Sequence, residues 1–216
     1  MEASFWHQRW ERNEIGFHGA SANALLVKHL PSLRLPQQSR VFIPLCGKTL
    51  DIHWLLGQGF HVAGAELSEL AVTQLFAELG VAPEIIQLGK LRHYRATHID
   101  IFVGDIFDLT ADTLGQVDAI YDRAAMVALP AQLRDKYTAH LTAISHTAPQ
   151  LLICYLYEQS QMSGPPFSVD DAEVKQHYQA HYILHLLESA DVAGGFKGHI
   201  PAEEHVWRLS RLTPQA

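Results

Sequence analysis

The sequence has 216 residues, of which 48% are hydrophobic and 18% charged, and its 16 Lys and Arg against 23 Asp and Glu give a formal net charge of -7. This composition is typical of a globular protein with one substantial core and excludes a disordered chain. The acidic balance would repel a phosphate backbone, so nucleic acid is not expected as a partner.

The chain is expected to be soluble, cytoplasmic and, by default, monomeric. Its first residues, "MEASFWHQRWERNE", contain no apolar run of the length that a signal peptide needs. No later run of about 18 apolar residues predicts a membrane span. Cys46 and Cys154 form no CxxC pair, which favours buried thiols in a reducing compartment over a disulfide or a metal site.

Short apolar runs alternate with helical patterns along the chain, which predicts an α/β protein built from βαβ units. A helix is expected over 21–30 with Ser21 as its cap, and another from the cap Ser68 to Gly80. About seven strands are expected, the last two as a closing hairpin. They are "RVFIPL", "FHVAGAEL", "IDIFVGD", "VDAIYD", "QLLICYLY", "YILHLLES" and "EHVWRLSRL".

The stretch "VFIPLCGKTLD" ends in Gly-Lys-Thr directly after a predicted strand, as a phosphate-binding loop does. Such a loop needs an earlier glycine in the pattern Gly-x-x-x-x-Gly-Lys-Ser/Thr, and Phe42 occupies that position. Pro44 also lacks the N–H group that a phosphate would need. The sequence therefore disfavours a nucleotide triphosphatase, although open α/β sheets do bind ligands at such strand ends.

Three further strand ends are expected at the same edge of the sheet. Glu66 follows Gly47 by about 20 residues, where a carboxylate can accept hydrogen bonds from both hydroxyls of an adenosine ribose. A capping or solvated glutamate is the alternative. Ile106 could pack on a purine ring. Arg123 could hold a carboxylate with two parallel hydrogen bonds, or pair with Asp122 or another acid. Adenosine-shaped contacts with a carboxylate clamp suggest S-adenosylmethionine.

Six segments, "FWHQRWERNEIGFH", "VFIPLCGKTLD", "GAELSELAV", "GDIFDL", "YDRAAMVALP" and "SGPPFSV", together resemble the bacterial branch of the thiopurine S-methyltransferase family over nearly the whole chain. The resemblance implies a single methyltransferase domain over 1–216, with the Rossmann-like sheet of class I S-adenosylmethionine-dependent methyltransferases and helices on both faces. It implies S-adenosyl-L-methionine as the cofactor, covered by an N-terminal segment, 1–20. The matching cofactor contacts are Trp10, Leu45, Glu66, Ile106 and Arg123.

By the same likeness, Phe17 in "GFH" lines the acceptor pocket opposite Phe167 of the "GPPF" loop, and Arg123 serves the acceptor as well as the cofactor. Lys197 stands near a position where the family tends to carry an arginine, so its role stays open. The implied reaction is S-methylation of a thiopurine-like aromatic or heterocyclic thiol. Methylation of selenium or tellurium compounds (metalloid detoxification) and a non-catalytic S-adenosylmethionine-binding module are the alternatives. No catalytic nucleophile or base is expected, because positioning supplies most of the catalysis.

The fourteen histidines raise the question of a metal site. His177, His181 and His185 in "HYQAHYILH" recur at a spacing that could place two imidazoles on one helix face. No cysteine and no HExxH glutamate completes the set, and the second half of the stretch resembles a strand. A solvated histidine stripe is therefore expected in place of a metal site.

Overall fold

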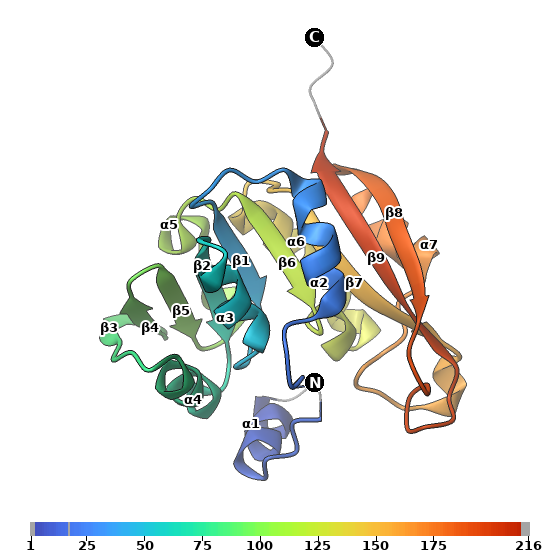
Figure 1. Ribbon diagram of the computed structural model, residues 1–216, viewed down its shortest axis with the longest axis horizontal. Helices are drawn as coiled ribbons and strands as arrows, with labels where there is room; N and C mark the ends of the chain where they lie inside the picture. The colour runs from blue at the N-terminus through green and yellow to red at the C-terminus, as the bar shows by residue number, and fades with distance from the viewer. Residues whose placement is uncertain (1–2, 17, 213–216) are drawn as a thin grey trace. The chain divides into compact units, whose positions relative to one another are not determined.

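The computed structural model describes residues 3–16 and 18–212 (Figure 1). Its contacts divide the chain into two compact units, Met1–Ala119 (unit 1) and Ile120–Ala216 (unit 2). The single domain expected over 1–216 stays a prediction. Among the described residues, no helix is long and apolar enough to cross a membrane.

Unit 1 contains short helices and most of the parallel strands. Its elements, in chain order, are α1 (Ala3–Glu11), α2 (Ala24–His29), the 3-10 helix η1 (Leu30–Leu33), β1 (Arg40–Pro44), α3 (Leu50–Gly57), β2 (His61–Glu66), α4 (Glu69–Leu79), β3 (Glu84–Leu88), β4 (Leu91–Ala96), β5 (Ile99–Val103), the 3-10 helix η2 (Ile106–Asp108) and α5 (Ala111–Leu114).

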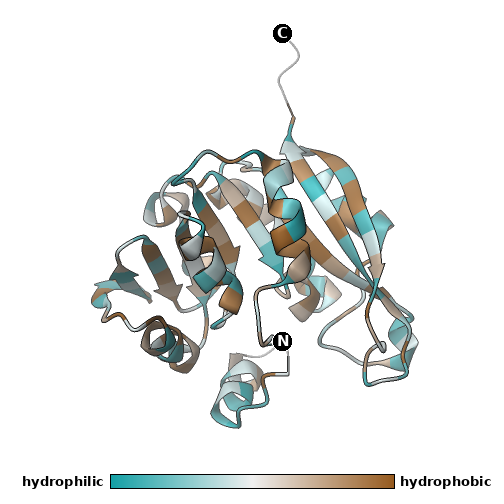
Figure 2. Ribbon diagram, in the orientation of Figure 1, coloured by the Kyte–Doolittle hydropathy of each residue, from teal (hydrophilic) through white to brown (hydrophobic). Residues whose placement is uncertain are grey.

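The strands of unit 1 lie in the order β3-β4-β5-β2-β1. β1, β2 and β5 are parallel, whereas β4 and β3 each run antiparallel to their neighbour. β1 and β2 are buried along nearly their whole length, which is typical of parallel strands covered on both faces, and Figure 2 shows them as largely hydrophobic. Helices α3 and α4 both contact β2.

The described strands number nine, so the expected count of about seven is wrong. The two that were missed, β3 and β4, form an antiparallel hairpin in which Leu88 pairs with Leu91 around the two-residue loop Gly89-Lys90. Gly89 has φ 59°, a conformation that tight hairpin loops require. Because β3 is exposed along most of its length, its sequence lacks the apolar alternation that identifies a half-buried strand.

Helix starts depend on particular caps. The helix expected over 21–30 begins later, because the side chain of Asn23, not Ser21, accepts hydrogen bonds from two backbone N–H groups of the first turn of α2. The limits expected for α4 are confirmed: Ser68 caps its start, and Gly80 ends it with φ 69°.

Unit 2 begins within β6. Its elements are β6 (Ala119–Arg123), the 3-10 helix η3 (Met126–Ala128), α6 (Ala131–Ile144), β7 (Gln150–Tyr157), the 3-10 helix η4 (Gln159–Gln161), α7 (Asp171–Tyr178), β8 (Tyr182–Asp191) and β9 (Ala202–Arg211). β6 is parallel to β7, and β9 runs antiparallel to both β7 and β8, so the expected closing hairpin is confirmed. Figure 2 shows alternating hydrophilic and hydrophobic bands on β8 and β9, as for strands with one buried face.

Gly64 lies in the middle of β2, where neighbouring side chains leave no room for a larger residue. A Cβ atom there would lie 2.7 Å from Ile101 Cδ1 and 2.8 Å from Cys46 Sγ. Burial raises the pKa of the Cys46 thiol well above its usual value, and the nearby Glu66 carboxylate raises it further. Cys46 is therefore a neutral group that fills space beside the glycine.

We expect Gly64→Ala to lower the free energy of unfolding by about 1–3 kcal/mol, because the added methyl group overpacks the interior. Denaturant unfolding followed by circular dichroism measures the change. Gly57→Ala is the matched control, since no atom lies within 4 Å of its Cβ position and unchanged or higher stability is expected. Equal stability of Gly64→Ala and the parent would contradict the packing described for β2.

Candidate functional site

The turn after β1 brings Leu45, Cys46 and Gly47 to the carboxyl end of the parallel strands. Leu45 and Gly47 both have positive φ, 47° and 53°, and the Cys46 N–H donates to the Ala65 carbonyl at 3.0 Å. The positive φ of Leu45 is uncommon for a residue other than glycine, and such conformations concentrate at functional sites.

The Gly-Lys-Thr sequence does not have the side-chain arrangement of a phosphate-binding loop. Lys48 Nζ forms an ion pair with Glu78 Oε1 at 2.6 Å, and Thr49 is the N-cap of α3. The lysine and the hydroxyl that would contact phosphate and metal in a triphosphatase therefore have structural partners in unit 1.

Glu66, the last residue of β2, is 6% exposed and anchors this turn. Its Oε2 accepts a hydrogen bond from the Gly47 N–H and its Oε1 one from the Ser68 N–H, both at 2.7 Å. Burial raises the pKa of Glu66, and hydrogen bonds from the backbone of Ser68, Gly47 and Leu67 oppose the rise. Glu66 is thus neither a helix cap nor a solvated side chain.

Trp10 of α1 covers the turn. Its indole Cζ2 lies 3.0 Å from where a Cβ atom of Gly47 would be, so a side chain at position 47 would meet the ring. Trp10 is 5% exposed, whereas Trp6 on the same helix is half-buried. The contact lies within unit 1, and the expectation that the segment 1–20 covers the cofactor stays a prediction.

Ile106 follows β5, the neighbour of β2. Asp105 caps the short helix η2 by accepting from the Phe107 N–H at 3.0 Å, and Ile106 is 5% exposed. The Gly104 N–H donates to the main-chain carbonyl of Glu66 at 2.9 Å, which ties the ends of β2 and β5 together. Four of the expected cofactor residues, Trp10, Leu45, Glu66 and Ile106, therefore belong to unit 1, three of them at adjacent parallel strand ends.

Arg123 belongs to unit 2, at the end of β6. The Asp122 carboxylate accepts hydrogen bonds from the Met126 N–H at 3.1 Å and the Tyr137 hydroxyl at 2.8 Å, so the alternative of a pairing between Arg123 and an acid falls to an acid other than Asp122. A charged neighbour of Arg123 is Glu204 of β9, and the side chain of Arg123 also interacts with Tyr155 of β7.

The structure describes only some of the residues that the sequence analysis expects on the acceptor side. Phe17 lies outside the described residues. The ring of Phe167 lies against the backbone of Gly164. The backbone N–H of Phe167 donates to the Val127 carbonyl at 2.6 Å. Lys197 has φ 53°, and its carbonyl accepts from His199 Nδ1 at 2.9 Å.

Sequence reasoning missed an aromatic group in unit 2. Phe196, next to Lys197, contacts Tyr155 and Tyr157 edge to face, with ring centroids 4.9 Å and 5.3 Å apart. The same cluster also contains Met162, Val192, Ile200 and Ala202. The two tyrosines alternate along "QLLICYLY", a signal that could have placed them on one face of a strand.

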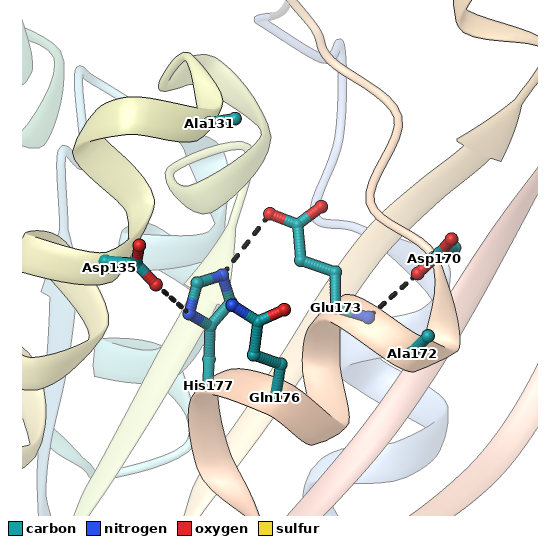
Figure 3. Close-up of a pocket in the computed structure, with 7 residues that line it drawn as sticks. All are labelled: Ala131, Asp135, Asp170, Ala172, Glu173, Gln176 and His177. Atoms are coloured by element: carbon teal, nitrogen blue, oxygen red, sulfur yellow. Dashed lines mark hydrogen bonds and ion pairs between the residues drawn. The ribbon is translucent and has the colours of Figure 1, made fainter.

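The histidines of "HYQAHYILH" do not share a helix. His177 lies on α7 and His185 on β8, which agrees with the strand expected for the second half. Figure 3 shows the His177 ring between Asp135 and Glu173. His177 Nδ1 lies 3.2 Å from Asp135 Oδ1 and His177 Nε2 lies 3.3 Å from Glu173 Oε1, and these residues line a pocket of about 410 Å³. Glu173 also receives two hydrogen bonds from Arg134, at 2.6 Å and 3.0 Å. This network joins α6 to α7.

Solved structures that share this fold include methyltransferases. The 1,6-didemethyltoxoflavin-N1-methyltransferase of Burkholderia thailandensis, solved with 1,6-didemethyltoxoflavin and S-adenosylhomocysteine, matches with a TM-score of 0.66 at 14% identity, over 96% of this chain and 87% of that chain. A SAM-dependent methyltransferase from Anabaena variabilis matches with a TM-score of 0.61 at 15% identity, over 96% and 94%. The fold is therefore that of the S-adenosylmethionine-dependent methyltransferases, as the sequence predicted.

Sequence comparison identifies the family. The sequence model of the thiopurine S-methyltransferase family matches residues 1–211. The thiopurine S-methyltransferase of Xanthobacter autotrophicus is 56% identical over 212 residues, covering 98% of this chain and 100% of the relative. That of Gluconobacter oxydans is 51% identical over 214 residues, covering 99% and 97%. The chain belongs to the thiopurine S-methyltransferase family, and its cofactor is S-adenosyl-L-methionine.

The buried carboxyl group of Asp122, next to Arg123, allows an experimental test of burial in the interior of unit 2. Burial raises its pKa from 3.8 to about 6, against hydrogen bonds from Tyr137, Met126 and Ala125. Between these pH values the native protein therefore holds a proton that the unfolded chain has lost. The free energy of unfolding contributed by this group falls as the pH rises from about 4 to about 6, by an amount on the order of 3 kcal/mol.

In Asp122→Asn this pH-dependent fall is expected to be absent, so the stability of the parent relative to the variant should decrease from pH 4 to pH 6. Denaturant unfolding of both proteins at pH 4, 5, 6 and 7 measures it. The exposed Asp112 gives the control Asp112→Asn. A constant difference between the parent and Asp122→Asn across this range would contradict the raised pKa.

Proposed function

We propose that the enzyme transfers a methyl group from S-adenosyl-L-methionine to the sulfur of a thiopurine-like aromatic or heterocyclic thiol. The observation that carries the cofactor half is the buried Glu66 carboxylate, held by the backbone of Gly47 and Ser68 beneath Trp10. The acceptor half is supported by the name that relatives up to 56% identical share, thiopurine S-methyltransferase.

The donor chemistry around Glu66 fits the adenosine part of the cofactor. A carboxylate offers roughly four acceptor positions, and the backbone N–H groups occupy only part of them, so ribose hydroxyls have acceptors available. Gly47 brings main chain close to the ligand. Leu45 and Ile106 would supply apolar contacts, Ile106 to the adenine ring, and Trp10 would cover the bound molecule.

We propose that Arg123 stabilises an anion, either the thiolate of the acceptor or the carboxylate of the cofactor. A guanidinium stays charged throughout the physiological pH range and offers several donors in a planar fork. A positive charge beside a heteroaromatic thiol lowers the thiol pKa and so favours the reactive thiolate. Phe17 is proposed as an aromatic wall of the acceptor pocket.

The reaction needs few catalytic groups. When bound, the cofactor supplies an electrophilic methyl group on a sulfonium with a neutral leaving group, so the chain must chiefly align donor and acceptor. A general base is unnecessary for an acceptor that is already a thiolate. Cys46 is unsuited to covalent catalysis, because the thiol is buried and its pKa is raised.

Two alternatives to methylation of a thiol are a different acceptor and binding of the cofactor without transfer. Selenium or tellurium compounds would also react as anions, and a non-catalytic module would bind the cofactor without transfer. The acceptor-side sequences "GFH" and "GPPF" favour an enzyme. We also propose a monomer in the cytoplasm that binds no nucleic acid, given two free buried cysteines and a net charge of -7.

Glu66→Gln and Glu66→Ala should weaken the binding of S-adenosylhomocysteine by about 10-fold to 100-fold, the effect of losing a hydrogen bond to a charged group. Isothermal titration calorimetry with S-adenosylhomocysteine, S-adenosylmethionine and ATP measures it. Glu78→Gln, on the ion pair with Lys48, is the control and should bind like the parent. Tight ATP binding without a response to S-adenosylmethionine would reject the cofactor assignment.

Radiolabelled methyl transfer onto thiopurines, small thiols, selenite and tellurite tests the acceptor. Transfer to thiopurines is expected to be the most efficient, and Arg123→Ala should lower kcat/KM by about 100-fold through loss of charge stabilisation. Arg95→Ala removes an exposed arginine of β4 and is the control. Faster transfer to selenite or tellurite would favour the metalloid alternative, and no transfer to any acceptor would favour the binding module.

A further inference from the structure

Strand register in unit 2 places three side chains on one face of its sheet. Arg123 of β6 pairs with Ile153 of β7, and two residues further along β7, Tyr155 pairs with Glu204 of β9. Residues that pair across strands share a face, as do residues two apart on one strand. Arg123, Tyr155 and Glu204 therefore lie on the same face, with Tyr155 in the diagonal position next to Arg123.

The three side chains form a chain of polar interactions. The Tyr155 hydroxyl interacts with both the Arg123 guanidinium and the Glu204 carboxylate. Because a guanidinium can only donate hydrogen bonds and a carboxylate can only accept them, the polarity of this chain runs from Arg123 through the phenol oxygen of Tyr155 to Glu204. Burial raises the pKa values of Tyr155 and Glu204, and the charge of Arg123 opposes both rises. Partial burial strengthens such a chain relative to one in water.

Tyr155 is itself held by packing. The Phe196 ring meets it edge to face with centroids 4.9 Å apart, and the same ring meets Tyr157 at 5.3 Å. The phenol of Tyr155 therefore has a fixed direction before any ligand binds. A rigid hydroxyl can transmit that direction to the longer and more flexible side chain of Arg123.

We infer that Tyr155 and Glu204 are positioning residues that fix the direction of the Arg123 guanidinium. The inference rests on the proposed function of Arg123. Tyr155 and Glu204 together orient the guanidinium, and Glu204 also balances part of its charge. The two residues act through Arg123 and contact neither methyl donor nor acceptor in this role.

This arrangement predicts a separation of kcat from KM. Arg123→Ala should raise KM for an anionic acceptor and lower kcat. Glu204→Gln should lower kcat about 10-fold while KM stays the same or falls, because the guanidinium keeps its charge, loses its counter-charge and is less well aligned. Tyr155→Phe should likewise lower kcat about 10-fold, with KM within about threefold of the parent.

Steady-state kinetics with 6-mercaptopurine as the acceptor tests this separation, alongside ¹⁵N NMR of the arginine side chains, with the Arg123 signals assigned by their loss in Arg123→Lys. In the parent we expect restricted rotation of the Arg123 guanidinium, and in Tyr155→Phe and Glu204→Gln we expect free rotation. The NMR measurement needs neither turnover nor cofactor.

Two matched controls separate positioning from stability. Glu203→Gln changes the neighbouring carboxylate, which faces the other side of β9 and contacts Ser189 and His205. Tyr178→Phe removes a buried hydroxyl that has no hydrogen-bond partner among the described residues. Both should leave kcat and the Arg123 signals unchanged, and thermal unfolding checks that all variants fold.

The results distinguish a failure of the proposed function from a failure of the positioning role of Tyr155 and Glu204. If Arg123→Ala is as active as the parent, or if the parent does not methylate 6-mercaptopurine, the proposed function fails while the NMR result still decides the positioning role. If Arg123→Ala is impaired but Tyr155→Phe and Glu204→Gln keep parental kcat and restricted guanidinium rotation, the inference is overturned and the proposed function stands.

Discussion

The hydrogen bonds of the buried Glu66 carboxylate are the interaction on which unit 1 depends at the carboxyl ends of its parallel strands. One carboxylate oxygen accepts a hydrogen bond from the Gly47 N–H in the turn after β1, and the other accepts one from the N–H of Ser68, the N-cap of α4. The main-chain carbonyl of Glu66 accepts from the Gly104 N–H after β5. A single residue therefore aligns three parallel strand ends. Because burial penalises its charge, the carboxylate depends on these backbone donors as much as they depend on it.

Several unusual features of unit 1 follow from this alignment. Gly47 must present its N–H to Glu66 with a left-handed backbone, and the space above it is taken by Trp10. Cys46 turns inward and fills the gap beside Gly64, which explains a glycine in the middle of a buried strand. Backbone donors that are fixed in advance cost little reorganisation when a ligand binds, which is how a preorganised site gains affinity.

In unit 2, side chains rather than backbone groups hold the charged residue in position. The guanidinium of Arg123 is directed by a tyrosine and a carboxylate on the two following strands of the sheet, and an aromatic ring from the loop between β8 and β9 packs against that tyrosine. Methyl transfer relies on alignment more than on acid or base chemistry. Rigid positioning of both a carboxylate and a cation is consistent with that requirement.

The sequence by itself determined the α/β class, the caps of α4, the closing hairpin and the family, because buried runs, capping residues and collinear motifs are local signals. It also placed Glu66 at the end of β2. The β3–β4 hairpin was missed because an exposed edge strand lacks an apolar pattern. Tertiary structure alone decided that the Glu66 carboxylate accepts from the Gly47 N–H, that Trp10 covers the turn, and that Arg123, Tyr155 and Glu204 share one face of the sheet. Those contacts join residues far apart in the chain, and strand register, which no local pattern encodes, brings them together.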